Sequence, residues 1–284
     1  MSGIPPGMHH VIDGPPDAPV VVLLDSLGST LEMWQPQVPE LATRFRVVRY
    51  DLPGHGGSAS PPGPYTIEGL GRDVCALLDG LGIERAHLAG LSIGGMIAMS
   101  IAARVPERVD RLALFATSAE LGPAERWAER AAAVLESGID VVVDAAVGRW
   151  FTPAYAASHP DTIARMRAMY ASTDPVGYAG CCRAIETMDQ TADLARIIAP
   201  TLVVVGADDP AIPPEHAEVI VAGIPDARLV VLQAAAHLVT WEQPRLTTGL
   251  LMRHLSGARE PGPAGRPWDA AGDGLGAGHG GIGR

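Results

Sequence analysis

Short runs of mainly apolar residues recur along this chain and predict the strands of one sheet. Most of these runs lack the alternation of apolar and polar residues that marks a strand with one solvated face. Continuous apolar runs are typical of strands buried on both faces of a parallel sheet. The predicted strands are residues 20–24, 47–50, 87–89, 112–116, 201–205 and 229–232, and residues 8–12 are expected to form a short edge strand.

The segments between these strands carry helical patterns. In residues 66–81, the apolar side chains from Leu70 to Leu81 recur at helical spacing, and Gly82 ends the helix. Three more helices are predicted at residues 93–104, near residues 215–222 and at residues 243–255. Strands that alternate with helices through right-handed crossovers predict an α/β fold, with a mostly parallel central sheet covered by helices on both faces.

The middle of the chain, from about residue 121 to residue 194, departs from this alternation. Its segments are helical, Asp174-Pro175 is an N-cap and first-turn signal, and no strand-like run interrupts them. A helical block inside a strand–helix alternation predicts a cap over the carboxyl edge of the sheet, where such folds bind ligands. We therefore expect a core formed by residues 1–120 and 196–256, a helical cap at 121–195, and a disordered tail rich in glycine and proline at 257–284.

The strongest chemical signal is Gly90-Leu91-Ser92-Ile93-Gly94, which lies between a predicted strand and a predicted helix. A strand-to-helix turn this tight needs small flanking residues. It also pushes the serine hydroxyl out of the sheet and points a helix N-terminus at it. The motif predicts that Ser92 is a nucleophile.

A serine nucleophile needs an imidazole to accept its proton and a carboxylate to orient that imidazole. In α/β sheets these groups follow later strands in the order Ser, Asp or Glu, His. Asp209 follows the strand at 201–205 and His237 follows the strand at 229–232, so the order is met. Asp208 is the alternative to Asp209, which is favoured because Pro210 fixes the turn after it. No asparagine occurs in the chain, so a Cys-His-Asn site is excluded.

An oxyanion formed at Ser92 would need two N–H donors. The spacing points to the backbone amides of Ile93 and Leu27. His55 lies in a Gly/Pro loop, where we expect it to hydrogen-bond the backbone rather than take part in catalysis.

Composition excludes several other kinds of chemistry. The formal net charge of −11 argues against nucleic acid or an anionic membrane as a partner, because both bind basic surfaces. The chain has no lysine, which removes Schiff-base chemistry and a Walker-type phosphate loop. Neither Cys75, Cys181 and Cys182 nor the pair His9-His10 forms a metal pattern. We expect no metal, free thiols and, since no signal peptide or membrane-spanning run is visible, a cytoplasmic protein.

Segments beyond these motifs resemble the α/β-hydrolase family and, within it, the 3-oxoadipate enol-lactonases. The resemblance covers about residues 20–255, and its specific part lies in the cap. The matching segments are residues 25–29, 33–34, 63–68, 90–96, 149–153, 177–182, 235–238 and 242–244. The family often carries Asn where Asp25 stands and Arg where Pro53 stands, and residues 239–241 also differ from its usual small polar residues.

The resemblance implies hydrolysis of an anionic enol-lactone by Ser92, His237 and Asp209, with no cofactor. The substrate carboxylate requires a local cation, and the candidates are Arg149 and Arg183, in or beside the family-like cap segments, and Arg126. Each of these could instead be a solvated surface arginine. Trp150 and Trp34 are candidates for pocket walls, although both could be core aromatics.

Two other functions stay open at this point. A general carboxylesterase or a cofactor-free, haloperoxidase-like hydrolase would share the triad but not a carboxylate-binding cap. A non-catalytic binding protein on the same scaffold would be expected to lack one member of the triad. The oligomeric state is left open by the sequence.

Overall fold

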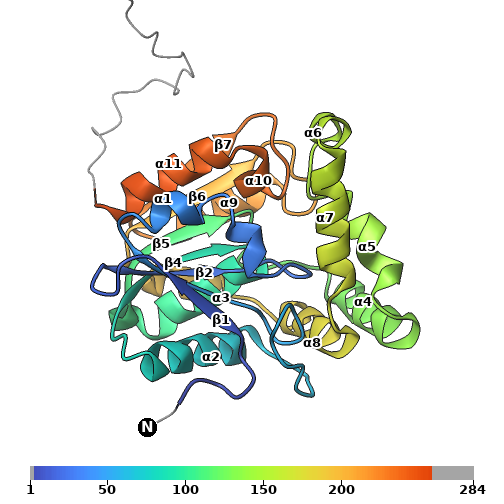
Figure 1. Cartoon of the computed structure of the whole chain (residues 1–284), viewed down its shortest axis with the longest axis horizontal. Helices are drawn as coiled ribbons and strands as arrows, with labels where there is room; N and C mark the ends of the chain where they lie inside the picture. Colours follow the sequence, from blue (N-terminus) through green and yellow to red (C-terminus); the bar gives the residue numbers. More distant parts are fainter. Residues whose placement is uncertain (1–2, 258–284) are drawn as a thin grey trace, which may run out of the picture.

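A twisted, seven-stranded sheet forms the centre of the molecule (Figure 1). The computed structural model describes residues 3–257. The strands are arranged in the order β1-β3-β2-β4-β5-β6-β7, and only β1 is antiparallel to its neighbour. Their bounds are β1 His10–Asp13, β2 Val20–Leu24, β3 Arg46–Tyr50, β4 Ala86–Leu91, β5 Val109–Phe115, β6 Thr201–Gly206 and β7 Ala227–Leu232. The predicted α/β architecture is confirmed.

Helices cover both faces of this sheet. One face carries α2 (Ile67–Gly80), α3 (Ile93–Arg104) and α9 (Pro214–Gly223), and the 3-10 helix η3 (Thr191–Arg196) packs against both α3 and α9. The other face carries α1 (Val38–Leu41) and α11 (Pro244–Leu255). Every residue of β4 is buried, as its continuous apolar run predicts for a central strand.

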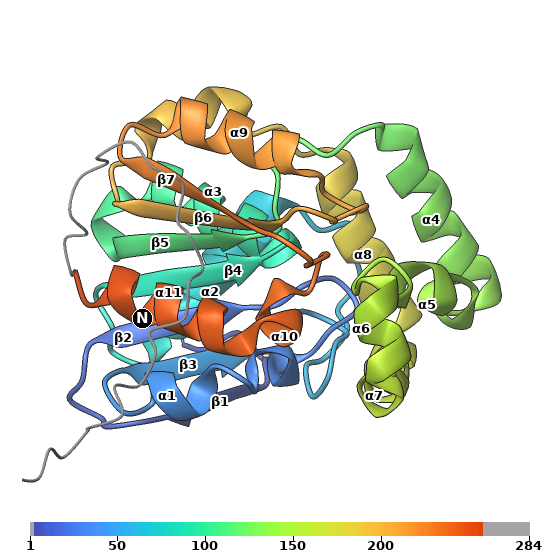
Figure 2. The same cartoon turned by 90° about the horizontal axis from the view of Figure 1, so that it is seen from above.

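Five helices lie together beyond one end of the sheet (Figure 2). They enter between β5 and β6, in the place of the predicted cap, and α4 packs against α8. They are α4 Ala124–Ser137, α5 Asp140–Val147, α6 Pro153–Ser158, α7 Pro160–Ala171 and α8 Pro175–Glu186. Asp174 caps α8 as predicted, because its carboxylate accepts hydrogen bonds from the Val176 and Gly177 amides.

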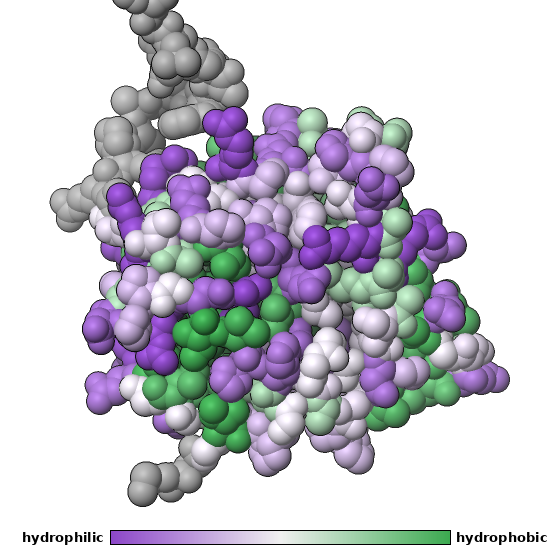
Figure 3. All heavy atoms as spheres, in the orientation of Figure 1, coloured by the Kyte–Doolittle hydropathy of each residue, from purple (hydrophilic) through white to green (hydrophobic). Residues whose placement is uncertain are grey.

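Several short elements were not predicted from the sequence, because a segment of three or four residues is too short to show a helical periodicity. They are the 3-10 helices η1 (Leu31–Trp34) and η2 (Pro106–Arg108) and the helices α1 and α10 (Val239–Glu242). No helix within residues 3–257 is long and apolar enough to cross a membrane. Figure 3 shows polar and apolar side chains mixed over one face, with apolar groups gathered on the side of β1 and α2. Apart from Gly257, the predicted tail lies outside the described residues.

Candidate active site

Ser92 occupies a strained turn between β4 and α3. Its backbone has φ 56° and ψ −121°, a conformation that costs free energy for any residue with a side chain. Two hydrogen bonds hold the turn: the Ser92 N–H donates to the Phe115 carbonyl at 3.0 Å, and the Thr117 hydroxyl donates to the Ser92 carbonyl at 2.7 Å. The neighbouring strand β5 therefore fixes the position from which the Ser92 side chain faces the pocket.

The glycines of the motif are required by close backbone approaches. A Cβ on Gly90 would lie 2.3 Å from the Gly94 carbonyl oxygen, and a Cβ on Gly94 would lie 2.3 Å from the Leu24 carbonyl oxygen. Neither backbone atom can move without disturbing β2 or the start of α3. The small residues predicted around Ser92 thus have a direct steric cause.

His237 and Asp209 meet at the same edge of the sheet. His237 Nδ1 lies 2.8 Å from Asp209 Oδ2, and both side chains are buried. Asp209 Oδ1 accepts hydrogen bonds from the Ala211 amide at 2.8 Å and the Ile212 amide at 3.0 Å, which fix the plane of the carboxylate. Because Nδ1 faces Asp209, Nε2 is the ring nitrogen left for the pocket. Asp208 is exposed, so Asp209 is the residue that the structure places against the imidazole.

The loop that carries His237 is tied to the cap. Glu242 Oε1 accepts hydrogen bonds from both the amide and the hydroxyl of Thr152, each at 2.8 Å, while Glu242 Oε2 accepts from the Ala236 amide. The Leu238 amide donates to the Trp150 carbonyl at 2.8 Å. The cap and the imidazole are therefore held in a fixed relation.

Two backbone amides beside Ser92 are free to bind an oxyanion. The Ile93 N–H opens α3, the Leu27 N–H lies in the turn after β2, and neither has an acceptor among the described residues. Leu27 lines the same pocket as Ser92. This arrangement can stabilise negative charge on a carbonyl oxygen attacked by the serine.

His55 fixes the turn that holds Leu27. Its Nδ1–H donates to the Pro53 carbonyl at 2.9 Å, and its Nε2 accepts from the Gly28 amide at 3.0 Å. Burial lowers the pKa of His55 to about 4, so the imidazole is neutral and can accept this bond. The prediction that His55 hydrogen-bonds the backbone is confirmed.

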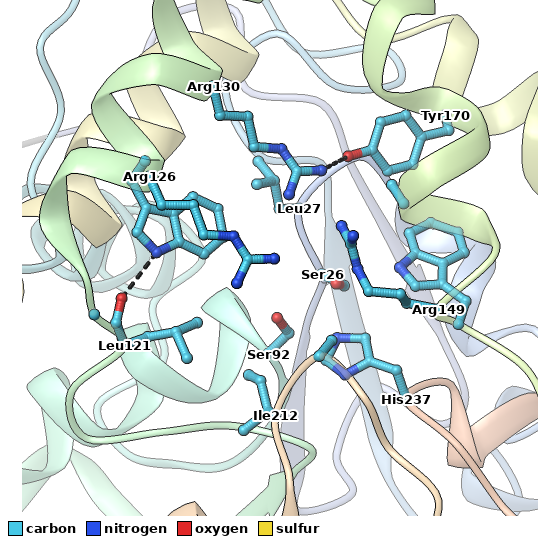
Figure 4. Close-up of a pocket in the computed structure, with 15 residues that line it drawn as sticks. Ser26, Leu27, Ser92, Leu121, Arg126, Arg130, Arg149, Tyr170, Ile212 and His237 are labelled. Carbon is cyan, nitrogen blue, oxygen red and sulfur yellow. Dashed lines mark hydrogen bonds between the residues drawn. The ribbon is translucent and has the colours of Figure 1, made fainter.

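Three arginines line the pocket that contains Ser92 and His237 (Figure 4). Arg126 and Arg130 come from α4, and Arg149 follows α5. No Asp or Glu lines this pocket, and within residues 3–257 none of the three forms an ion pair. The remaining lining residues are mostly apolar or aromatic: Ser26, Leu27, Leu121, Gly122, Trp127, Ala146, Trp150, Tyr170, Ala211 and Ile212.

Arg130 is held in place by aromatic residues. Its Nη2 donates to the Tyr170 hydroxyl at 2.9 Å, and that hydroxyl lies 2.6 Å from the Tyr178 hydroxyl. The guanidinium carbon also lies 5.5 Å from the centre of the Trp127 ring and 5.6 Å from that of Tyr178, within the range of cation–π attraction. Burial lowers the pKa of Arg130, but the neighbouring Tyr170 and Tyr178 outweigh this effect and raise it.

The comparisons with known proteins agree with this geometry. A sequence model of the family described as "alpha/beta hydrolase fold" matches residues 19–244. The chain belongs to the α/β-hydrolase family. It is 36% identical to 3-oxoadipate enol-lactonase 2 of Acinetobacter baylyi, over 84% of this chain and 89% of that protein.

Two solved hydrolase structures are also similar. The enol-lactonase from Burkholderia xenovorans LB400 superimposes with a TM-score of 0.86 at 40% identity, over 88% of this chain and 96% of that one. A hydrolase from Pseudomonas aeruginosa PA01 gives a TM-score of 0.85 at 44% identity, over 87% and 94% of the two chains. The predicted resemblance to the enol-lactonases is confirmed.

Not every predicted binding residue of this α/β-hydrolase reaches the pocket. Arg126, Arg149 and Trp150 line it. Arg183 does not, because its guanidinium pairs with Glu186 at 2.6 Å, one helical turn further along α8. Trp34 lies fully buried under the sheet edge, where its ring meets Phe115 edge to face and its Nε1–H donates to the Leu24 carbonyl at 3.3 Å. The structure thus makes Trp34 a core aromatic.

The sequence reasoning missed Arg130 and its partner Tyr170. A signal for Arg130 was present, since Arg126 and Arg130 are four residues apart and share one face of a helix. No comparable signal identifies Tyr170, which lies 40 residues further along the chain.

Asp25 is the other unexpected feature of the site region. It lies at the end of β2, is fully buried, and neither carboxyl oxygen has a hydrogen-bond partner among the described residues. Burial raises the pKa of Asp25 well above its ordinary value, and the charge on Asp51 adds to this effect. Burial therefore favours the neutral form of Asp25, which lies next to the turn that carries Leu27.

Proposed function

We propose that this α/β-hydrolase opens 3-oxoadipate enol-lactone, a five-membered enol-lactone with a carboxylate on its acetate arm. The observation that carries the proposal is the pocket lining. Three arginines line the pocket that contains Ser92 and His237, and within the described part of the chain none of them pairs with a carboxylate and no Asp or Glu lines the pocket. Such a pocket favours an anionic substrate over a neutral one. The similarity to enol-lactonases from two bacteria supports the same substrate class.

In the proposed mechanism Ser92 attacks the lactone carbonyl while His237 Nε2 accepts its proton. Asp209 keeps the imidazole in the required tautomer and stabilises its charged form. The Leu27 and Ile93 amides receive the oxyanion. Collapse of the tetrahedral intermediate breaks the ring C–O bond and expels an enolate, which is a better leaving group than a simple alkoxide.

The leaving group stays tethered to the acyl-enzyme, so ring closure competes with hydrolysis. Protonation of the enolate carbon by the His237 imidazolium gives a ketone, which cannot reclose as the enolate does. Water, activated by the neutral His237, then attacks the acyl carbon and releases Ser92. The product is an acyclic oxo-dicarboxylate, and no cofactor enters any step.

A comparison of two substrates tests the proposal. We expect kcat/KM for the enol-lactone to exceed that for a neutral aryl ester by about 100-fold, as a charge-assisted contact made only to the anion would give. A preference for the neutral ester would favour the general carboxylesterase instead.

The nucleophile is tested separately. Ser92→Ala should abolish turnover of both substrates, while Ser118→Ala, which changes a buried serine away from the pocket, should retain it. Unchanged turnover in Ser92→Ala would refute the triad and favour the non-catalytic binding protein.

A further inference from the structure

The pocket holds more positive charge than a single carboxylate needs. A lactone with one acetate arm brings one negative charge, whereas Arg126, Arg130 and Arg149 bring three positive charges to the same lining. None of them is neutralised by an acid within the described part of the chain. Hydrolysis of the lactone creates a second carboxylate, so the charge of the bound molecule changes during the reaction.

The three arginines fall into two groups. Arg130 is held by the Tyr170 hydroxyl and by the Trp127 and Tyr178 rings, and in the view of Figure 4 it is drawn beyond Arg126 and Arg149 as seen from Ser92. Arg126 and Arg149 extend from opposite sides into the space above Ser92 and His237 (Figure 4). The position at Arg130 is therefore rigid. Arg126 and Arg149 have no hydrogen-bond or ion-pair partner for their side chains among residues 3–257, and both extend toward Ser92.

The near arginines also repel one another. Burial lowers the pKa of Arg149, and the charges on Arg130 and Arg126 lower it further. An anion placed between Arg126 and Arg149 would relieve this repulsion. The carboxyl group that hydrolysis forms at the carbon attacked by Ser92 would lie above Ser92, in the space into which these two arginines extend (Figure 4).

We propose that the pocket contains two anion subsites, one at Arg130 and Tyr170 and one at Arg126 and Arg149, and that it binds linear dicarboxylates more tightly than monocarboxylates of the same length. The identity of the product rests on the proposed function, whereas the preference for dicarboxylates does not. Its consequence is that the dianionic product competes with the monoanionic substrate, so the enzyme is inhibited by its own product.

Binding of two six-carbon acids, adipate and hexanoate, tests the two subsites. Isothermal titration of the Ser92→Ala protein should give a Kd for adipate at least about 10-fold below that for hexanoate, the effect of one additional charge-assisted contact. The affinity for adipate should also fall more steeply with salt. Equal affinities and equal salt dependence would overturn the proposal, whatever the behaviour of any variant.

Substitutions then separate the subsites. Arg149→Met should remove most of the preference for adipate and leave hexanoate binding within about twofold, because the single carboxylate binds at Arg130. Arg130→Met should weaken both acids. Arg183→Met, which alters a cap arginine outside the pocket, is the matched control and should change neither. An adipate preference that survives in Arg149→Met would refute the near subsite.

Failure of this inference is distinguishable from failure of the proposed function. If the enzyme hydrolyses the enol-lactone but does not prefer adipate to hexanoate, the proposed function stands and the second subsite is refuted. If the protein prefers adipate but does not hydrolyse the enol-lactone, the two subsites stand and the proposed function is refuted.

Discussion

The backbone amide of Gly28 donates a hydrogen bond of 3.0 Å to Nε2 of His55. This bond joins the loop after β3 to the turn after β2, whose residue Leu27 lines the pocket. Since Gly28 follows Leu27 directly, the orientation of the Leu27 amide depends on it. His55 therefore acts as a positioning residue, in contrast to His237, which lies beside Ser92.

His55→Ala should lower kcat about 10-fold or more and leave KM nearly unchanged, because it disturbs an oxyanion donor rather than substrate binding. It should also reduce the free energy of unfolding by about 1–3 kcal/mol, the cost of a buried N–H without a partner. Steady-state kinetics and urea unfolding measure both effects. His10→Ala serves as the control, and an unchanged kcat in His55→Ala would contradict the assignment.

Asp209→Asn should lower kcat by about 10³- to 10⁴-fold, because an amide can no longer stabilise the charged imidazole or select its tautomer. The adjacent and exposed Asp208 provides a matched control in the same loop, and Asp208→Asn should retain full activity. Rates of lactone hydrolysis measure the difference. If Asp208→Asn were the inactive variant, the assignment of the triad would be reversed.

Asp25→Asn should stabilise the protein, increasingly so at higher pH. In the unfolded chain Asp25 ionises near its ordinary pKa of 3.8, whereas in the folded protein its raised pKa keeps it protonated to higher pH. Ionisation of the unfolded chain therefore lowers the free energy of unfolding as the pH rises above about 3.8. While the folded carboxyl stays neutral, the advantage of Asn should grow by about 1.4 kcal/mol per pH unit. Denaturant unfolding at several pH values tests this, and a stability difference independent of pH would contradict it.

His254 should make the fold sensitive to acid. Burial lowers its pKa to about 4, and His254 donates to the Leu112 carbonyl at 3.0 Å. Because the pKa of His254 is lower in the folded protein than in the unfolded chain, the neutral imidazole contributes to the free energy of unfolding. This contribution, about 3 kcal/mol, is fully present above about pH 6.5 and is lost as the pH falls toward 4. His254→Gln keeps a donor for Leu112 but cannot titrate. Its stability should fall less than that of the wild type between pH 7 and pH 4, and parallel losses would refute the role of His254.

Gly94→Ala should reduce both stability and activity. The new Cβ would lie 2.3 Å from the Leu24 carbonyl oxygen, so α3 must shift away from β2 at a cost of about 1–3 kcal/mol. Gly249→Ala in α11 is the matched control, because its nearest atom would be 3.4 Å away at the end of the Arg253 side chain. That change should stabilise the protein by about 0.5–1 kcal/mol. Thermal unfolding distinguishes the two, and similar effects of both would contradict the steric argument.

The sheet and the positions of Ser92, Asp209 and His237 could be predicted from the sequence because they depend on local patterns. Continuous apolar runs predict buried parallel strands, and the carboxyl ends of parallel strands meet at one edge of a sheet. Residues in the loops that follow three such strands can therefore lie near one another. Glycines at fixed offsets from Ser92 added a steric requirement that can also be recognised from the residue types alone.

The substrate pocket could not be predicted in the same way. Whether a cap arginine faces Ser92 depends on the rotation of its helix, which is set by packing between segments far apart in the sequence. Arg183 on α8 pairs with Glu186, while Arg130 on α4 is fixed by Tyr170 from α7. Local patterns determined which residues could perform the chemistry. Only the tertiary structure decided which charges surround it, because side-chain direction in the cap follows from long-range packing.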